Sequence, residues 1–260
     1  MTRILFIGDA VGACGRDLLK RKLWTLRKNF RADAVIVNGE NSADGNGITP
    51  DSAEDLLLAG ADVITGGNHS LRRREILPML EERSEILRPL NLPKGAPGTG
   101  VHLLILPGGQ RLLTVNLLGQ AFMDQHADNP FDALDEVLKR MKGKYDLSVV
   151  DFHAESTGEK AALARAFDGH VTAVLGTHTH VQTADARLFA GGTAFISDVG
   201  MSGAVDSILG CEAEGVISRF RTGLPARFVQ ATGRASLCGA VLEADEATGR
   251  AISLSDFEQE

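Results

Sequence analysis

The sequence predicts an α/β fold made of two mixed sheets with helices on their outer faces. The first half alternates short apolar runs with helical patterns, which is typical of parallel strands joined by crossover helices. The second half adds pairs of apolar runs around short Gly-containing turns, which indicate antiparallel hairpins. The 260 residues are 43% hydrophobic and 23% charged, enough for a sizeable core. We therefore expect one domain over residues 1–260.

The first half contains three predicted strand–helix units. The predicted strands cover residues 3–8, 32–41 and 61–69, and the predicted helices cover 17–30, 50–60 and 71–80. Pro50 stands at the start of the second helix, where its missing N–H costs nothing. Residues 91–100 are rich in Gly and Pro and predict a loop.

The second half mixes hairpins with two further strand–helix units. Hairpins are predicted over 101–119, 187–198 and 238–257, strands over 145–155 and 171–181, and helices over 130–143 and 156–167. Residues 198–210 predict a Gly-bearing loop, and the tail that follows is expected to form strands.

The bulk composition excludes several function classes. A net charge of −7 disfavours stable polynucleotide binding, which needs a basic stripe. Three cysteines without a C-x-x-C pair, and an N-terminus without a secretory leader, favour a cytoplasmic protein with free thiols. No apolar run of about 18 residues occurs, so no membrane span is expected. Base rates favour an even-numbered homo-oligomer.

Polar side chains follow the predicted core strands at the point where each strand ends. In chain order they are Asp9, Glu40, Asn41, Asn68, His69, His153, His178 and His180. Ligands of α/β sheets collect at the carboxyl ends of strands, so we expect these side chains to meet if the strands share a direction.

These residue types are suited to two divalent cations. Carboxylates, imidazoles and amide oxygens bind Mn, Fe, Zn or Ni, and paired ions activate a water for attack on phosphorus. With only Asp9, Glu40 and a bridging hydroxide as anions, the centre keeps a charge of about +1, which favours a phosphate ester. If the strand continues through His180, His178 and His180 point to the same side.

The ordered motifs GDAVG, NGEN, GGNH, DFHAE and GTHTH, with the loop DVGMSG, resemble the calcineurin-like metallophosphoesterases, and most closely their bacterial YmdB-like branch. The resemblance implies the metallophosphoesterase fold, a four-layer α/β/β/α sandwich, with a dinuclear centre. It also implies a small-molecule nucleotide substrate. The expected activity is hydrolysis of cyclic nucleotides, above all 2′,3′-cyclic and otherwise 3′,5′-cyclic nucleoside monophosphates.

The resemblance also implies a role for each residue. One ion is expected among Asp9, Glu40, Asn41 and His180, and the other among Glu40, Asn68, His153 and His178, with Glu40 as the bridge. A hydroxide held between the ions would attack phosphorus, and His69 would protonate the leaving ribose oxygen as the general acid. Fe or Mn is the favoured pair, with Zn or Mg as alternatives.

Two positions depart from the wider superfamily. Val11 stands where the first motif usually carries a histidine, which makes Asn41 the candidate replacement, and Glu40 replaces the usual bridging aspartate. Candidates to orient the ligands are Asp151, Glu155 and Thr179. Gly8 and Gly12 are expected to provide a turn and clearance around the ion.

Other functions stay open at this point. The same centre suits a phosphomonoesterase or nuclease, and the same fold suits a nucleotide-sensing regulatory protein. A dinucleotide-binding oxidoreductase would use IGDAVGACGR as its phosphate loop, but the spacing is G-x-x-x-G-x-x-G and Asp9 would face the pyrophosphate. Arg72, Arg73 and Arg74 are either substrate contacts or a solvated helix face, and no substrate-binding residue is assigned.

Overall fold

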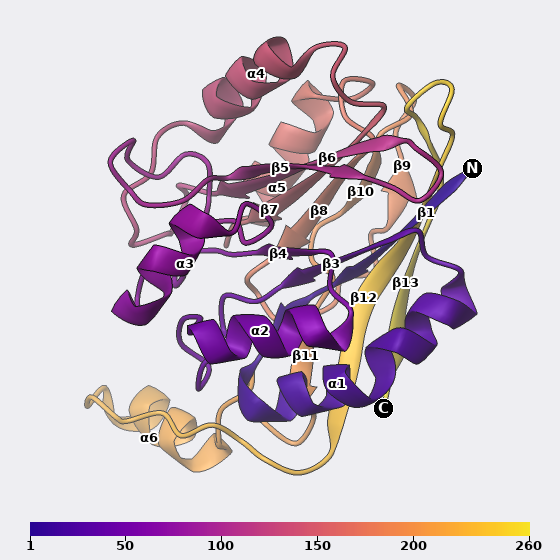
Figure 1. The fold of residues 1–260 in the computed structure, drawn as a ribbon. Helices are drawn as coiled ribbons and strands as arrows, with labels where there is room; N and C mark the ends of the chain where they lie inside the picture. Colours follow the sequence, from indigo (N-terminus) through magenta and orange to yellow (C-terminus); the bar gives the residue numbers. More distant parts are fainter.

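A computed structural model describes residues 1–260 as two β-sheets packed face to face (Figure 1). The strands of the first sheet are β1 (Thr2–Ile7), β2 (Asp9–Ala10), β3 (Ala34–Asn38), β4 (Val63–Thr65), β11 (Met201–Ala204), β12 (Ala235–Ala244) and β13 (Ala251–Gln259). Those of the second sheet are β5 (Val101–Ile105), β6 (Arg111–Leu118), β7 (Leu147–His153), β8 (Ala173–Thr177), β9 (Arg187–Leu188) and β10 (Ala194–Ile196).

Both sheets are mixed, as predicted. The first has the order β2-β11-β12-β1-β3-β4, with β13 paired to β12, and the second has the order β5-β6-β7-β8-β10-β9. Strands β1, β3 and β4 run parallel, as do β6, β7, β8 and β10. The three predicted hairpins are confirmed as the antiparallel pairs β5–β6, β9–β10 and β12–β13. The parallel strands of each sheet bring their carboxyl ends to one edge.

Helices cover the outer faces of both sheets and complete four layers (Figure 1). They are α1 (Gly12–Phe30), α2 (Pro50–Ala59), the 3₁₀ turn η1 (Arg74–Ile76), α3 (Leu77–Glu82), α4 (Pro130–Met141), α5 (Thr157–Ala166) and α6 (Ala213–Thr222). One apolar cluster joins α1 and α2 to the first sheet, a second joins the two sheets, and a third joins α4 and α5 to the second sheet. The three clusters are the three interfaces of an α/β/β/α sandwich.

Helix α2 illustrates how local sequence sets the boundaries. The Thr49 hydroxyl accepts from the Ser52 amide and the Ser52 hydroxyl accepts from the Thr49 amide, which closes a capping box around Pro50. At the other end Gly60 adopts φ 114°, a left-handed conformation that ends the helix. The strand β4 that follows is thereby aimed back along β3.

Three predicted elements are wrong. Residues 71–73 are a turn rather than helix, because the helical segment begins only at the 3₁₀ turn Arg74–Ile76 before Pro78. Residues 201–204 form strand β11, whose backbone pairs with β12 and β2, inside the predicted loop. Residues 213–222 form helix α6 where strands were expected, and its C-cap Gly223 has φ 71°.

Residues 205–230, which we call the arm, leave the first sheet after β11 and carry α6 away from the sandwich (Figure 1). Val216 is the one buried residue of α6, whereas Phe220 is 84% exposed. None of the helices combines the length and the hydropathy that a bilayer-spanning segment needs.

Candidate metal centre

The predicted site residues gather where the parallel strands of both sheets end. β1, β3 and β4 of one sheet and β7 and β8 of the other deliver them. The eight residues brought together are Asp9, Glu40, Asn41, Asn68, His69, His153, His178 and His180. The His178 amide donates to Asp9 Oδ2 at 3.1 Å and so ties the two sheets together at this edge.

The most buried part of the site is a cluster of acceptor atoms around His153. Its Nε2 lies 3.2 Å from Glu40 Oε1, 3.1 Å from Asn68 Oδ1 and 3.1 Å from His178 Nδ1. The ligating atoms of Glu40, His153 and His178 all lie within 4.8 Å of one another, so they can hold one metal ion. The second imidazole nitrogen of His178, Nε2, lies 3.1 Å from Glu155 Oε2.

His153 is oriented from behind by Thr177 and Asp151. Thr177 Oγ1 donates to Asp151 Oδ1 at 2.7 Å, so it accepts from His153 Nδ1 at 2.9 Å. Asp151 is fully buried and also accepts from Asn38 Nδ2 at 2.9 Å and from the Thr65 hydroxyl. Neutral His153 therefore keeps its proton on Nδ1 and turns the Nε2 lone pair into the site, the tautomer that a metal ligand needs.

The site fits a cation because hydrogen-bond acceptor atoms face one another without a donor between them. Glu155 holds the proton of His178 on Nε2, so Nδ1 of His178 and Nε2 of His153 turn lone pairs toward each other. The Glu40 carboxylate and the Asn68 carbonyl add negative charge at the same point. Buried lone pairs in this arrangement require a proton or a metal ion between them. Oxygen and imidazole ligands without a thiolate suit divalent Mn, Fe or Zn.

The pKa values of the site residues reflect the same concentration of negative charge. Burial opposes ionisation of Glu40, but the charge and hydrogen bond of His153 outweigh it and hold the pKa of Glu40 well below its usual range. Burial likewise opposes a charged His153, yet Glu40 and Asp9 raise the pKa of His153 to about 9. Burial and the charge on His153 lower the pKa of His178 to about 3. The cationic position is thus at His153 Nε2, where a proton and a metal ion compete.

Asp9, Asn41 and His180 form a second group beside the first. Asp9 is fully buried, and its Oδ1 has no hydrogen-bond partner, lying 3.7 Å from His180 Nε2. The amide Nδ2 of Asn41 lies 3.0 Å from Glu40 Oε1 and 3.2 Å from His180 Nε2. An orphaned buried carboxylate oxygen facing an imidazole nitrogen is a second place that a cation would satisfy.

His69 closes the site on the solvent side. Its amide donates to Glu40 Oε2 at 2.9 Å, and its Nδ1 lies 2.7 Å from Asn41 Oδ1. Because Asn41 Oδ1 is an acceptor, Nδ1 carries the proton of neutral His69 and Nε2 is not engaged. Burial lowers the pKa of His69, partly offset by Glu40 and reinforced by the nearby charge of Arg72.

The GTHTH segment does not extend the strand, contrary to the sequence expectation. β8 ends at Thr177, and His178 and His180 adopt φ values of 102° and 64°. Non-glycine residues rarely take such left-handed conformations, which persist only where surrounding contacts hold them. Both imidazoles still reach the site, but through a looped backbone rather than through alternation on a strand.

A buried ion pair holds this histidine loop. Lys160 Nζ, fully buried on α5, donates to the Thr177 carbonyl at 2.7 Å and lies 3.0 Å from Asp198 Oδ2. Asp198 in turn accepts from the amides of Thr179 at 2.9 Å and Gly200 at 2.9 Å. The pair therefore anchors the loop at both ends of the turn that presents His178.

Glycines let the backbone approach the site and its neighbours. A Cβ on Gly67 would lie 2.2 Å from Glu40 Oε2 and 2.3 Å from a ring carbon of His153. The glycines of the first turn serve packing and not clearance around an ion, contrary to expectation. A Cβ on Gly8 would meet the Gly200 carbonyl at 1.9 Å, and one on Gly12 would meet the Gln230 side chain at 1.9 Å.

Several residues of the site escaped sequence reasoning. Thr177, Lys160 and Asp198 hold the candidate ligands from behind, and the Leu209 carbonyl accepts from His180 Nδ1 at 3.1 Å. The only sequence signal for Asp198 was its place in the DVGMSG motif. Of the three candidate orienting residues, Asp151 and Glu155 use their side chains, but Thr179 contributes only its amide.

Two mixed sheets that deliver carboxylate, amide and imidazole ligands to one edge define a protein of the calcineurin-like metallophosphoesterase class. The profile of the family described as "YmdB-like protein" matches residues 5–257. The chain therefore belongs to the YmdB-like family.

Individual relatives agree with this assignment. A Bacillus subtilis (strain 168) protein named "2′,3′-cyclic-nucleotide 2′-phosphodiesterase" is 43% identical over 252 residues, covering 97% of this chain and 95% of the relative. A crystal structure of a hypothetical protein from Thermus thermophilus is 42% identical with a TM-score of 0.93, covering 100% and 99% of the two chains. A crystal structure of a novel phosphatase from Mycoplasma pneumoniae is 36% identical with a TM-score of 0.93, covering 99% and 93%.

Proposed function

We propose that this protein is a metal-dependent phosphodiesterase that hydrolyses 2′,3′-cyclic nucleoside monophosphates. The observation that carries the proposal is the convergence of lone pairs from Glu40, Asn68, His153 and His178 on one buried point. The name of the Bacillus subtilis relative supports the same substrate class. The site opens to a cleft through His69 and His180, so a substrate has access.

Two ions, Fe or Mn, are the proposed cofactors. Glu40, Asn68, His153 and His178 would hold one, and Asp9, Asn41 and His180 would hold the other, with Glu40 shared. Bound divalent ions supply a deprotonated water as nucleophile and neutralise charge on the phosphate. Asp9→Asn is expected to lose metal, and full metal content in that variant, measured by elemental analysis, would contradict the assignment.

His69 is the proposed general acid. In the reaction a water oxygen bonds to phosphorus, the P–O2′ bond breaks, and O2′ takes up a proton. In its protonated form His69 donates from Nδ1 to Asn41 Oδ1 and carries a second proton on Nε2, the atom that would deliver it. Burial lowers its pKa, so the protonated ring is a stronger acid, and the fraction of enzyme with this ring protonated falls as the pH rises.

The variant His69→Ala tests this role. We expect kcat to fall by about 10²–10⁴-fold with metal content unchanged, because general acid catalysis contributes that much. His126→Ala is the matched control, since His126 is an exposed histidine that does not line the cleft outside the site. Unchanged turnover by His69→Ala would refute the acid role.

A hydrolysis panel on the metal-loaded protein separates the proposal from its rivals. The panel contains 2′,3′-cyclic and 3′,5′-cyclic nucleotides, a phosphomonoester and RNA. Turnover of the phosphomonoester or of internal RNA bonds alone would indicate a phosphomonoesterase or a nuclease. Tight nucleotide binding without turnover of any substrate would indicate a regulatory sensor.

We also propose a cellular location, an assembly state and a domain count for this protein. A cytoplasmic location is supported by three free thiols, Cys14, Cys211 and Cys238. A homo-oligomer rests on base rates. One domain over residues 1–260 is supported by the continuous apolar packing between the two sheets.

A further inference from the structure

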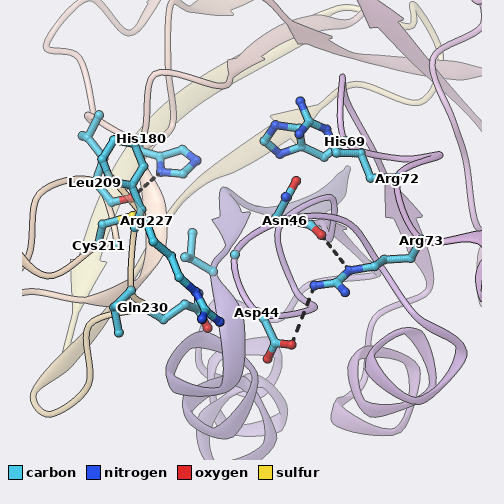
Figure 2. A pocket seen from close by; sticks show the side chains of 15 residues that line it. Asp44, Asn46, His69, Arg72, Arg73, His180, Leu209, Cys211, Arg227 and Gln230 are labelled. Atoms are coloured by element: carbon cyan, nitrogen blue, oxygen red, sulfur yellow. Dashed lines mark hydrogen bonds and ion pairs between the residues drawn. The ribbon is translucent and has the colours of Figure 1, made fainter. Parts of the chain in front are cut away.

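A cleft of about 880 Å³ opens directly outside the metal centre (Figure 2). His69 and His180 form its inner end. One wall carries Asp44, Asn46 and Arg73, and the arm supplies the opposite wall with Arg227 and Gln230 (Figure 2). This volume is at the large end of the range for small-molecule sites.

The cleft is electropositive although the whole chain is acidic. Arg72, Arg73 and Arg227 line it, and Asp44 is the one carboxylate among the lining residues. Asp44 Oδ2 lies 3.7 Å from Arg73 Nη2, while Arg72 and Arg227 form no ion pair. Two positive charges therefore face the cleft without a counter-charge, in a protein whose net charge is −7.

Neither of these two charges is engaged inside the protein, in contrast to that of Arg73. Arg73 donates from Nε to the Asn46 carbonyl at 3.0 Å, which fixes it to its wall (Figure 2). The amide of Arg72 donates to the His69 carbonyl at 3.0 Å, which keeps Arg72 beside this histidine. Arg227 extends from the arm into the cleft toward Gln230 (Figure 2). An exposed guanidinium group without an ion-pair partner is suited to bidentate recognition of phosphate.

A simple cyclic mononucleotide does not match this charge. Its only anionic group is the cyclic phosphate, and that group belongs at the metal centre under the proposed function. The unpaired guanidinium groups of the cleft would then face a neutral nucleoside. A substrate with a further phosphate on the nucleoside would satisfy them.

We propose that the cleft is a subsite for a second phosphate, and that the preferred substrate is a nucleoside 2′,3′-cyclic phosphate carrying a phosphate at its 5′ position, held by Arg227 with Arg72. The inference rests on the proposed function and narrows its substrate class. The 5′ group is either a terminal monoester or the diester that links the nucleotide to a preceding one in a short oligonucleotide.

This substrate has a definite chemical origin. When a ribose 2′-oxygen attacks the adjacent 3′-phosphodiester of RNA, the P–O2′ bond forms and the P–O5′ bond breaks, leaving a 2′,3′-cyclic end with a phosphate on its 5′ side. RNA cleavage by transphosphorylation is thus the class of reaction that supplies it. A longer RNA should bind little more tightly, because the positive charge is confined to the cleft. The affinity gained from counterion release grows only with the number of phosphates that the protein contacts.

The test compares three substrates with the metal-loaded protein: adenosine 2′,3′-cyclic phosphate, its 5′-phosphorylated form, and the dinucleotide ApA with a 2′,3′-cyclic end. We expect kcat/KM to rise about tenfold or more on adding the 5′ phosphate, as one charge-assisted contact allows. If kcat/KM is raised for the 5′-monoester alone, the substrates are free 5′-phosphorylated nucleotides. If it is raised for both the monoester and the dinucleotide, the substrates are the ends of short RNA. Equal values for all three overturn the subsite and leave the proposed function standing, whereas no turnover of any overturns both.

Arginine variants assign the effect to the cleft. In Arg227→Gln and Arg72→Gln the ratio of kcat/KM values with and without the 5′ phosphate should fall toward one. Arg221→Gln is the matched control, because Arg221 is an exposed arginine of the same arm outside the cleft, and it should keep the wild-type ratio. Raised salt should lower the wild-type ratio. A ratio that survives both cleft variants overturns the proposal.

Discussion

The floor of the site and the arm that faces it are built in opposite ways. The floor, which comprises Glu40, Asn68, His153 and His178, lies at the ends of core strands, and hydrogen bonds from residues behind it orient His153 and His178. The arm, residues 205–230, has one buried residue in its helix and presents unpaired arginine to the cleft. Bond-forming chemistry needs positions held to fractions of an ångström, while recognition of a variable substrate tolerates looser support.

The floor and the arm are also stabilised by different interactions. Strain at His178 and His180 is maintained by the buried pair of Lys160 and Asp198, so the floor depends on interactions within the core. The arm closes mostly on itself, through bonds such as that from the Glu212 amide to the Val229 carbonyl at 2.8 Å. Changes behind the floor should therefore alter stability and metal binding together, and changes on the exposed face of α6 should alter neither.

The largest effect is expected from Lys160→Met. It leaves Asp198 as an uncompensated buried charge, which costs about 3–5 kcal/mol of unfolding free energy. Urea unfolding followed by circular dichroism measures the loss. The double variant Lys160→Met/Asp198→Asn removes both charges and should recover part of it, and a double variant no more stable than the single one would argue against the ion pair.

Gly67→Ala should cause a smaller loss of stability but a clear loss of metal. The added Cβ would overlap Glu40 Oε2 and His153, and strain of this kind costs about 1–3 kcal/mol. The matched control is Gly158→Ala, where the nearest atom would be 3.6 Å away. Isothermal titration with Mn²⁺ reads out the difference, and equal affinities in the two variants would show that the close approach at Gly67 is not needed.

Metal affinity of the floor should rise with pH. The pKa of His153 is raised to about 9, so the ring is protonated below that pH and the ion must displace a proton. Affinity should increase about tenfold per pH unit up to about pH 9 and then level off. Calorimetry in buffers of different ionisation enthalpy measures whether metal binding releases a proton, as expected. Affinity that stays constant from about pH 6 to about pH 9 would place the proton elsewhere.

The smallest effect belongs to the arm. Phe220→Ser replaces a side chain that is 84% exposed, and surface substitutions change stability by about 0.5 kcal/mol or less. Unfolding and metal titration should both match the wild type. A marked loss of stability would mean that Phe220 is covered, for example by a second copy of the chain, and that the arm is not a free wall.

The order of residues in the sequence was sufficient to predict much of the fold and of the candidate site. Pairs of apolar runs around Gly-containing turns predicted the hairpins β5–β6 and β12–β13, and the position of polar residues after apolar runs selected all eight side chains that meet at the edge. It failed for α6, of which only one residue is buried, so the core does not select a helical side of residues 213–222. It also failed for β11, whose Gly-containing sequence is typical of a loop and becomes a strand only through pairing with β12.

The chemical types of the candidate ligands, the strand ends that carry them and the acidity of the chain are properties of the sequence alone, because they depend on residue identity and local period. The loop conformation of His178 and His180, the tautomer of His153 and the electropositive cleft depend on the folded structure. Each arises between segments far apart in the chain, such as Lys160 with Asp198, or Arg72 with Arg227. Local patterns carry no information on such pairs, because side-chain electrostatics and backbone strain are set by whichever neighbours the core brings within a few ångströms.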